Sequence, residues 1–145
     1  MIKVMITGHL PERLNGREER LREWIKKTLK ELGPSNTYNF SGMARGTDTI
    51  FAEVVKEMRL PLVCAFPYEH PLCEKEQEMF DYAEQVYYQS KEKTKTCYTE
   101  RDKWMVDHSD VVLVVWDGKP SGGAYEVMKY AEEDKTIIMF PWEEE

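Results

Sequence analysis

Hydrophobic residues along the chain recur at two alternating spacings. Short apolar runs typical of β-strands, such as IKVMIT at residues 2–7, precede segments in which apolar residues recur every three or four positions, as in helices. The pattern predicts strands at residues 2–7, 38–40, 62–66, 86–89, 111–115 and 136–140. It predicts helices at residues 14–32, 48–58, 74–85, 100–108 and 123–133, and it ends the first of them at Gly33 and Pro34.

The order of these segments predicts the fold class. Strands separated by helices pair in parallel through right-handed crossovers. The continuous apolar run VVLVVW at residues 111–116 is typical of a strand covered on both faces. We therefore expect one α/β domain over residues 1–145, with three layers and a mainly parallel sheet. Ligands of such sheets bind beyond the carboxyl ends of the strands, so the loops at that edge hold the candidate site.

The first candidate loop is the turn FSGMARGTD, which joins the predicted strand at residues 38–40 to the helix at residues 48–58. Gly42 and Gly46 permit unusual backbone angles and close approach of a ligand. The amides at the helix start, together with Arg45, can hold a phosphate or a similar anion. The alternative is a plain connector in which Thr47 or Asp48 caps the helix.

A second turn of the same kind, WDGKPSGGAYEV, follows the strand at residues 111–115 and enters the helix at residues 123–133. Both turns fall at the same predicted edge, so we expect a two-loop cradle in which the amides of residues 42–47 and 122–124 bind phosphates. Glu126 lies in the first turn of the second helix. It either stabilises the helix start or reaches the ligand, where it could bind ribose hydroxyls or act on a glycosidic carbon.

Further loop residues complete the predicted site. Gly8 follows the first strand directly, and His9 either belongs to a tight turn or borders the ligand. Tyr68 and Trp116 are candidates to lie near a base. The predicted ligand-binding residues are Gly8, His9, Ser41, Gly42, Met43, Arg45, Gly46, Thr47, Asp48, Tyr68, Trp116, Asp117, Lys119, Ser121, Gly122, Gly123 and Ala124.

The charge and the apolar runs bear on partners and location. A formal net charge of −7 argues against general binding of DNA, RNA or anionic lipid, because such partners need excess Lys and Arg. We expect any phosphate to be held by local groups. No apolar run is long enough to span a bilayer, and the chain opens on a strand rather than a signal peptide, so we expect a soluble cytoplasmic protein.

The remaining composition points away from metals and disulfides. The 3 cysteines show no CxxC spacing, so neither a disulfide framework nor a zinc site is expected, and we predict no cofactor. On the helix at residues 100–108, Arg101 shares a face with Trp104 and is expected to pack on the sheet. Trp24 or Trp104 could instead serve an interface between copies, so a homo-oligomer stays open.

Three motifs in order, MIKVMITGH, FSGMARGTD and MVDHSDVVLVVWDGKPSGGAYEVMKYA, resemble the YspA/YpsA-like branch of the SLOG superfamily, named for Smf/DprA and Lonely Guy proteins. The resemblance covers most of the chain. It implies a Rossmann-like fold and a nucleotide or nucleotide-derived ligand, such as an ADP-ribose species. It also implies that Gly8 and His9 lie by the ligand. One phosphate loop would be formed by Ser41, Gly42, Arg45, Gly46 and Asp48, and the other by Gly122, Gly123 and Glu126.

The chain departs from these relatives in places. Lonely Guy phosphoribohydrolases carry the pattern PGGxGTxxE, whereas PSGGAYEV keeps the double glycine and the glutamate but lacks the Gly-Thr pair. Their catalytic arginine has no counterpart by motif, although Arg45 or Arg101 could approach the site. The segment GGAYEVMKYA is also similar to the part of nucleoside deoxyribosyltransferases that supplies a glutamate nucleophile.

Three functions follow from these observations. The first is a binding module that senses or sequesters a nucleotide-derived ligand. The second is an N-glycosidase or phosphoribohydrolase with Glu126 as the catalytic carboxylate and Asp117 or Asp48 orienting ribose or water. The third is a structural or interaction protein in which the cleft is not used.

Overall fold

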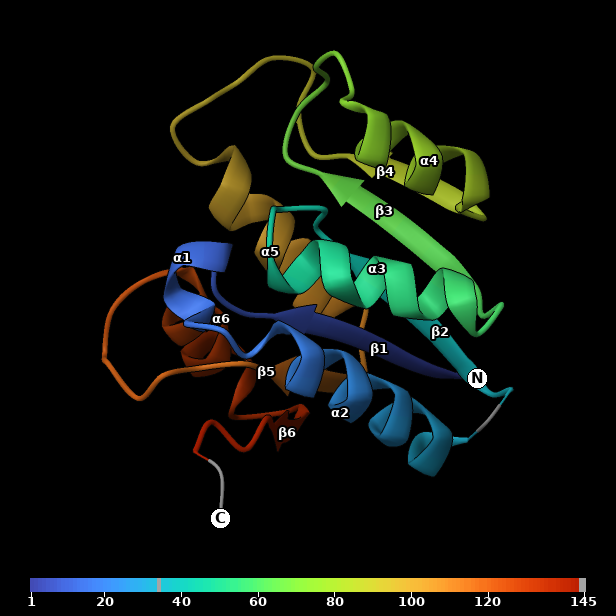
Figure 1. The fold of residues 1–145 in the computed structure, drawn as a ribbon. Coiled ribbons are helices and arrows are strands. Elements are labelled where there is room, and N and C mark those ends of the chain that lie inside the picture. Colours follow the sequence, from blue (N-terminus) through green and yellow to red (C-terminus); the bar gives the residue numbers. More distant parts are fainter. Residues whose placement is uncertain (34, 144–145) are drawn as a thin grey trace.

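The computed structural model describes residues 1–33 and 35–143. The strands are β1 (Ile2–Thr7), β2 (Thr37–Ser41), β3 (Leu62–Phe66), β4 (Gln85–Tyr88), β5 (Val111–Val114) and β6 (Thr136–Met139). The helices are α1 (Pro11–Leu14), α2 (Glu18–Leu32), α3 (Thr47–Glu57), α4 (Glu74–Tyr82), α5 (Cys97–Asp107) and α6 (Gly123–Ala131). Strands and helices alternate along most of the chain, as the hydrophobic pattern predicts (Figure 1).

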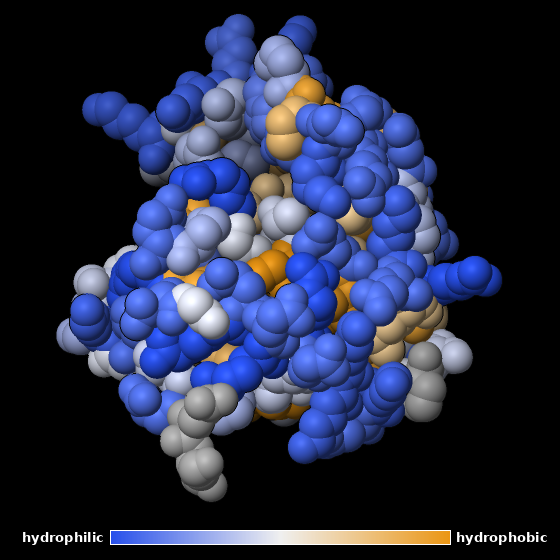
Figure 2. All heavy atoms as spheres, viewed as in Figure 1, coloured by the Kyte–Doolittle hydropathy of each residue, from blue (hydrophilic) through white to orange (hydrophobic). Residues whose placement is uncertain are grey.

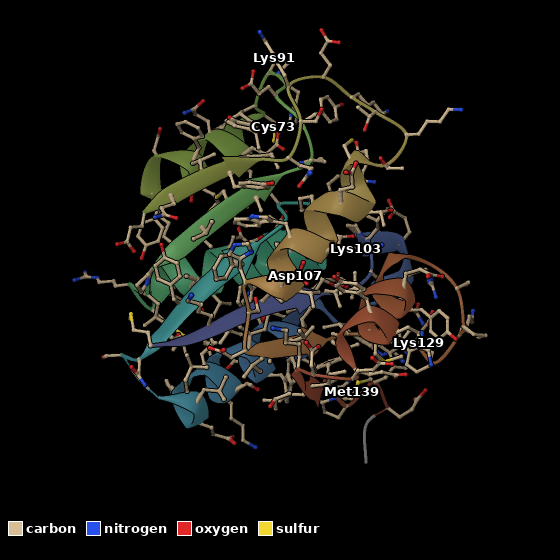
Figure 3. The ribbon with its side chains drawn as sticks, turned by 180° about the vertical axis from the view of Figure 1, so that it is seen from behind. Cys73, Lys91, Lys103, Asp107, Lys129 and Met139 are labelled. Carbon is tan, nitrogen blue, oxygen red and sulfur yellow. The ribbon has the colours of Figure 1, made fainter. Side chains whose placement is uncertain are left out.

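The strands form one sheet in the order β4-β3-β2-β1-β5-β6, and every neighbouring pair is parallel. Helices α2, α3 and α4 cover one face, and α5 and α6 cover the other, as the views from the front and from behind show (Figures 1 and 3). The predicted Rossmann-like α/β fold is confirmed, and the sheet is wholly parallel. The strand order reverses between β1 and β5, and this switch point leaves a crevice at their carboxyl ends.

Hydrophobic residues on the two faces of the sheet form separate clusters. Val4 and Ile6 of β1 pack in the cluster beneath α2, α3 and α4, whereas Met5 between them packs in the cluster beneath α5 and α6. Successive side chains of a strand point to opposite faces. Because both faces are covered by helices, the strands are apolar at consecutive positions rather than at alternate ones.

The predicted helix at residues 14–32 is wrong at its start. Asn15 and Gly16 have φ values of 52° and 80°, which end α1 at Leu14, and α2 begins at Glu18. Left-handed backbone cannot continue a right-handed helix. Pro34, predicted to help end this helix, lies outside the described residues.

Each of the other four predicted helices differs from the structure at one or both ends, by one to three residues. The predicted helix at residues 74–85 ends as α4 at Tyr82, because Ala83 is extended with a ψ of 143°. The predicted helix at residues 100–108 begins three residues earlier, at the buried Cys97. This earlier start brings Tyr98 into the first turn of α5, at the carboxyl edge of the sheet.

Most of the molecular face seen in Figure 2 is hydrophilic, and hydrophobic residues show only in small separate patches. Among the described residues, no helix is both long enough and apolar enough to cross a membrane.

The two tryptophans considered for an interface are half-buried. Trp24 packs edge-on against Phe140, with ring centroids 5.4 Å apart, and Trp104 stacks on Tyr87 at 3.8 Å.

Candidate functional site

A cleft of about 450 Å³ opens beyond the carboxyl end of β1. Its walls come from the loop after β1, the start of α3, the first turns of α5 and the start of α6. This is the switch point of the sheet, where ligands of such folds bind. The cleft brings together six of the predicted site residues, namely Gly8, His9, Asp48, Gly122, Gly123 and Ala124.

The turn between β5 and α6 leaves its backbone open to the cleft. Gly122 has a φ of 94°, and a Cβ there would lie 2.7 Å from Nη1 of Arg13. A Cβ on Gly123 would meet no atom within 4 Å. The first amides of a helix have no partner within the helix, and they carry the positive end of its dipole. The first amides of α6 thus need acceptors from outside the helix, and Gly123 and Ala124, which carry them, both line the cleft.

Arg13 is held beside this helix start by Asp117. Its Nε and Nη2 donate hydrogen bonds to the Asp117 carboxylate at 3.0 and 2.8 Å, and its Nη1 donates to the Ser121 carbonyl oxygen at 3.3 Å. The Asp117 side chain is only 8% exposed, whereas that of Arg13 is 35% exposed. Burial acts to raise the Asp117 pKa, but the hydrogen bonds from the Lys119 amide and from Arg13 outweigh burial and lower it. Asp117 therefore stays charged and fixes the guanidinium at the rim of the cleft.

Arg13 is not among the ligand-binding residues predicted from the sequence. It lies in the loop that follows β1, four positions after His9, and the rule that ligands bind at the carboxyl edge applies to this loop as well. That rule was the available signal. The pairing of Arg13 with Asp117, 104 positions away in the chain, was not visible in the sequence.

His9 connects the loop after β1 to the loop after β5. Its Nε2 accepts a hydrogen bond from the Asp117 amide at 3.0 Å, and its ring meets Trp142 edge-on at 5.5 Å. Burial and the charge of Arg13 lower the His9 pKa, against the opposing effect of the Asp117 carboxylate. A neutral imidazole with an acceptor Nε2 fits these contacts. His9 thus lines the cleft and also holds its loops together.

The turn between β2 and α3 is closed by its own side chains. The Ser41 hydroxyl donates to the Asp48 carbonyl oxygen at 2.8 Å and accepts from the Met43 amide at 3.1 Å. The Asp48 carboxylate accepts from the Ala44 amide at 3.3 Å. Ser41 and Met43 are buried. Amides that the predicted cradle assigned to a phosphate are thus bonded within the fold.

The start of α3 is bonded to the loop after β1 in the same way. The amide and hydroxyl of Thr47 both donate to the His9 carbonyl oxygen, at 3.2 and 2.9 Å. Gly46 has a φ of 86°, and a Cβ there would lie 2.7 Å from that same oxygen. Arg45 points to solvent, with a side chain 70% exposed, and forms an ion pair with Glu12 at 3.3 Å.

Arg101 lies in the lining of the cleft with the carboxyl groups of Asp48 and Asp102, and the exposed Glu12 lines its rim. Arg101 is 5% exposed, and its Nη1 donates to the carbonyl oxygens of Gly42 and Ala65 at 2.7 and 3.0 Å, while its Nε donates to Asp102 at 2.8 Å. Burial raises the pKa of Asp48 to about 7, although Arg101 opposes the rise. Burial also raises the pKa of Asp102. Of the two arginines considered from the sequence, Arg101 lines the cleft and Arg45 does not.

Other predicted residues lie outside the cleft. Glu126 is exposed and lines a neighbouring hollow of about 430 Å³ between α5 and α6, which shares Asp102 and Gly123 with the cleft. Trp116 donates its indole N–H to the Lys119 carbonyl oxygen at 2.7 Å. Among the described residues that line the cleft, neither Glu126 nor Trp116 is present.

A third hollow, of about 250 Å³, lies beyond the carboxyl end of β3. It is lined by four more of the predicted residues, Gly42, Met43, Arg45 and Tyr68.

Within residues 1–33 and 35–143, no group of three His, Cys, Asp or Glu side chains is placed so that it could hold a metal ion.

Comparison with known proteins identifies the fold. No protein-family model and no curated protein matches the chain. The structure is similar to DprA from Streptococcus pneumoniae, with a TM-score of 0.76 and 16% identity, over 97% of this chain and 50% of that one. It is also similar to TM1055, with a TM-score of 0.60 and 18% identity, over 90% of this chain and 68% of that one.

A third similar structure concerns the single-stranded DNA binding mode of DprA from Helicobacter pylori, with a TM-score of 0.64 and 16% identity, over 97% of this chain and 65% of that one. The chain thus spans 50% and 65% of the two DprA chains. The likeness confirms the fold implied by the resemblance to the Smf/DprA and Lonely Guy superfamily, and it does not distinguish the YspA/YpsA-like branch.

This likeness contradicts the prediction of no general nucleic-acid binding. The prediction rested on the net charge of −7, yet DprA from Helicobacter pylori binds single-stranded DNA with the same fold. Net charge averages over the whole surface, whereas phosphates contact local groups. Lys91, Lys93 and Lys95 are exposed on the loop between β4 and α5, and Figure 3 shows Lys91 projecting away from the body of the protein.

Proposed function

We propose that the cleft binds a nucleotide or nucleotide-derived ligand, such as an ADP-ribose-like molecule, and that the protein senses or sequesters it. One observation carries the proposal: the start of α6 and the Arg13 guanidinium border the same cleft. Helix amides and a positioned guanidinium are both groups that bind phosphate. Together they supply local positive potential in a protein whose net charge is −7.

The acidic side chains of the cleft support one orientation of the ligand. Asp48 and Asp102 line the cleft beside Arg101. A carboxylate repels a phosphate but accepts hydrogen bonds from sugar hydroxyls. The phosphate is therefore assigned to the β5–α6 turn, and the ribose hydroxyls are assigned to Asp48 and Asp102. This orientation fits a ligand that carries both a phosphate and a free sugar.

The proposal assigns phosphate binding to one turn rather than to the predicted two-loop cradle. In the β2–α3 turn, the amides of Met43, Ala44 and Thr47 already have acceptors within the protein. This turn contributes the side of the cleft formed by Ala44 and Asp48. The β5–α6 turn would then bind the phosphate, and the β2–α3 turn would form one wall of the cleft.

The alternative is an N-glycosidase or phosphoribohydrolase that acts on a nucleoside monophosphate or an NAD-like substrate. Its support is the position of Glu126, whose hollow adjoins the cleft at Asp102 and Gly123. A carboxylate there could act on the anomeric carbon of a ribose held near Asp102. A single-stranded oligonucleotide is a further candidate ligand, because a terminal nucleotide carries the same phosphate and sugar.

A ligand panel separates these functions. The purified protein is incubated with AMP, GMP, NAD, ADP-ribose and a short single-stranded oligodeoxynucleotide, and both bound intact ligand and free base are measured. We expect retention of an unaltered nucleotide, weakened about tenfold or more by Arg13→Gln, which corresponds to about 1.4 kcal/mol. Arg59→Gln, at an exposed arginine after the far end of α3, is the matched control and should leave affinity unchanged.

Other results would change the assignment. Base release that Glu126→Gln abolishes would favour the glycosidase. Binding of the oligonucleotide alone would favour a nucleic-acid partner. If no member of the panel is retained and none raises the melting temperature, the proposed function is wrong.

A further inference from the structure

The hollow at the carboxyl end of β3 adjoins the cleft. Ala44, Tyr98 and Arg101 line both of them. Arg101 is buried and bonded to the carbonyl oxygens of Gly42 and Ala65, so the partition between the two spaces is a fixed part of the fold. A ligand that extends from the cleft past Tyr98 would enter the second hollow.

The chemistry of the second hollow differs from that of the cleft. Its lining includes the rings of Phe66, Tyr68, His70 and Tyr98, together with Pro67. Tyr68 lies 5.1 Å from His70 and 6.2 Å from Tyr98 between ring centroids. Rings of this kind supply flat apolar faces with polar edges.

The charged groups of this hollow are already engaged by other residues. Glu76 accepts a hydrogen bond from the Cys73 amide at 3.0 Å and lies 3.8 Å from His70. Arg45 is paired with Glu12. The rings that surround these groups suit a flat, uncharged ligand group.

Tyr98 is the residue that connects the two spaces. It lies in the first turn of α5 and is 45% exposed, although large aromatic side chains are usually well buried. An exposed tyrosine at the mouth of a hollow can stack on a nucleobase, and such stacking tolerates any base.

We propose that the hollow beyond β3 is the base subsite of the ligand, with Tyr98 stacking on the base and Tyr68, which meets Tyr98 edge to face, lining the subsite beside it. The inference rests on the proposed function and makes it more specific: the ligand is a base-bearing nucleotide rather than a sugar phosphate. It also assigns the base to Tyr68 and Tyr98 and not to Trp116, whose indole N–H is bonded to Lys119.

Paired ligands test this inference. Affinities of AMP, GMP, CMP, UMP and ribose 5-phosphate are measured by calorimetry for the wild type, Tyr98→Ala, Tyr98→Phe and Tyr130→Ala. Tyr130 is the control, since it is 42% exposed on α6, its hydroxyl is bonded to Asp107, and it lines the hollow of Glu126 rather than the cleft or the hollow beyond β3. Melting temperatures establish that each variant is folded.

We expect at least one mononucleotide to bind more tightly than ribose 5-phosphate. Tyr98→Ala should weaken that nucleotide about tenfold, within the roughly 5- to 150-fold range of stacking losses, while ribose 5-phosphate changes less than about twofold. Tyr98→Phe should retain most of the affinity, and Tyr130→Ala should retain all of it.

Three results would overturn the inference. Equal binding of ribose 5-phosphate and the nucleotides, or equal losses of both in Tyr98→Ala, would reject the base subsite while leaving phosphate binding intact. A change of oligomeric state in Tyr98→Ala would mark the hollow as a contact between proteins. Failure of the wild type to bind any of the five ligands would reject the subsite, and it would reject the proposed function as well if NAD and ADP-ribose also fail to bind.

Discussion

The β2–α3 turn and the β5–α6 turn both join a buried strand to a helix through glycines, yet the glycines have different roles in the two turns. Gly46 is required within the fold, because its φ is 86° and a Cβ would lie 2.7 Å from the His9 carbonyl oxygen. Gly123 has open space where its Cβ would be. The first turn binds the loop after β1, and the second presents a helix start to the cleft.

A glycine-rich turn from a strand into a helix is therefore not an anion site by its glycines alone. The motif alone permits an anion site, but the site exists only where the amides are left without protein acceptors. Side-chain oxygens of Ser41 and Asp48 accept from amides in the first turn. In the second turn, Arg13 lies beside the helix start and adds a positive charge.

The largest effect is expected from Gly46→Ala. The new methyl group would meet the His9 carbonyl oxygen and the Pro11 nitrogen, at 2.7 and 2.9 Å, in a backbone conformation unfavourable to alanine. We expect a loss of about 3 kcal/mol in the free energy of unfolding, measured by denaturant titration. A loss below about 1 kcal/mol would contradict the view that this turn is a closed structural unit.

A smaller effect concerns the pH dependence of stability. Burial raises the Asp48 pKa to about 7 from an ordinary value of 3.8, so the folded protein holds a proton that the unfolded chain releases in this interval. Stability should therefore fall as the pH rises from about 4 to about 7. Asp48→Asn removes this titration. Between pH 5 and pH 8, the free energy of unfolding of the variant should therefore fall by about 2 kcal/mol less than that of the wild type.

Comparison of Asp48→Asn with the wild type across that pH range also tests the closed turn. Asp81→Asn, at an exposed position on α4, serves as the control. Parallel stability curves for Asp48→Asn and the wild type would show that Asp48 ionises normally and that the turn is more open than the contacts indicate.

The smallest effect on stability is expected from Gly123→Ala, the counterpart of Gly46→Ala. Because the Cβ position is open, the free energy of unfolding should change by less than about 1 kcal/mol. The same methyl group would lie at the cleft wall, where it should weaken AMP binding about tenfold. Unchanged affinity in calorimetry would remove the β5–α6 turn from the phosphate site.

Much of the fold followed from local patterns in the sequence. The strands at residues 2–7 and 62–66 have the predicted limits, and the apolar face of α2 at Leu21, Ile25 and Leu29 is buried as its spacing indicates. The break between α1 and α2 was missed, because it depends on left-handed backbone at Asn15 that hydrophobic spacing does not report.

For the candidate site, the order of strands and helices in the sequence was enough to predict which loops meet, because parallel strands bring their carboxyl ends to one edge. Gly8, His9, Asp48 and residues 122–124 line one cleft. The tertiary structure sets which groups remain available there. It paired Arg13 with Asp117, used Arg101 to bond two buried carbonyl oxygens, and placed Glu126 in an adjoining hollow. These outcomes depend on contacts between distant segments, and local spacing carries no information about such partners.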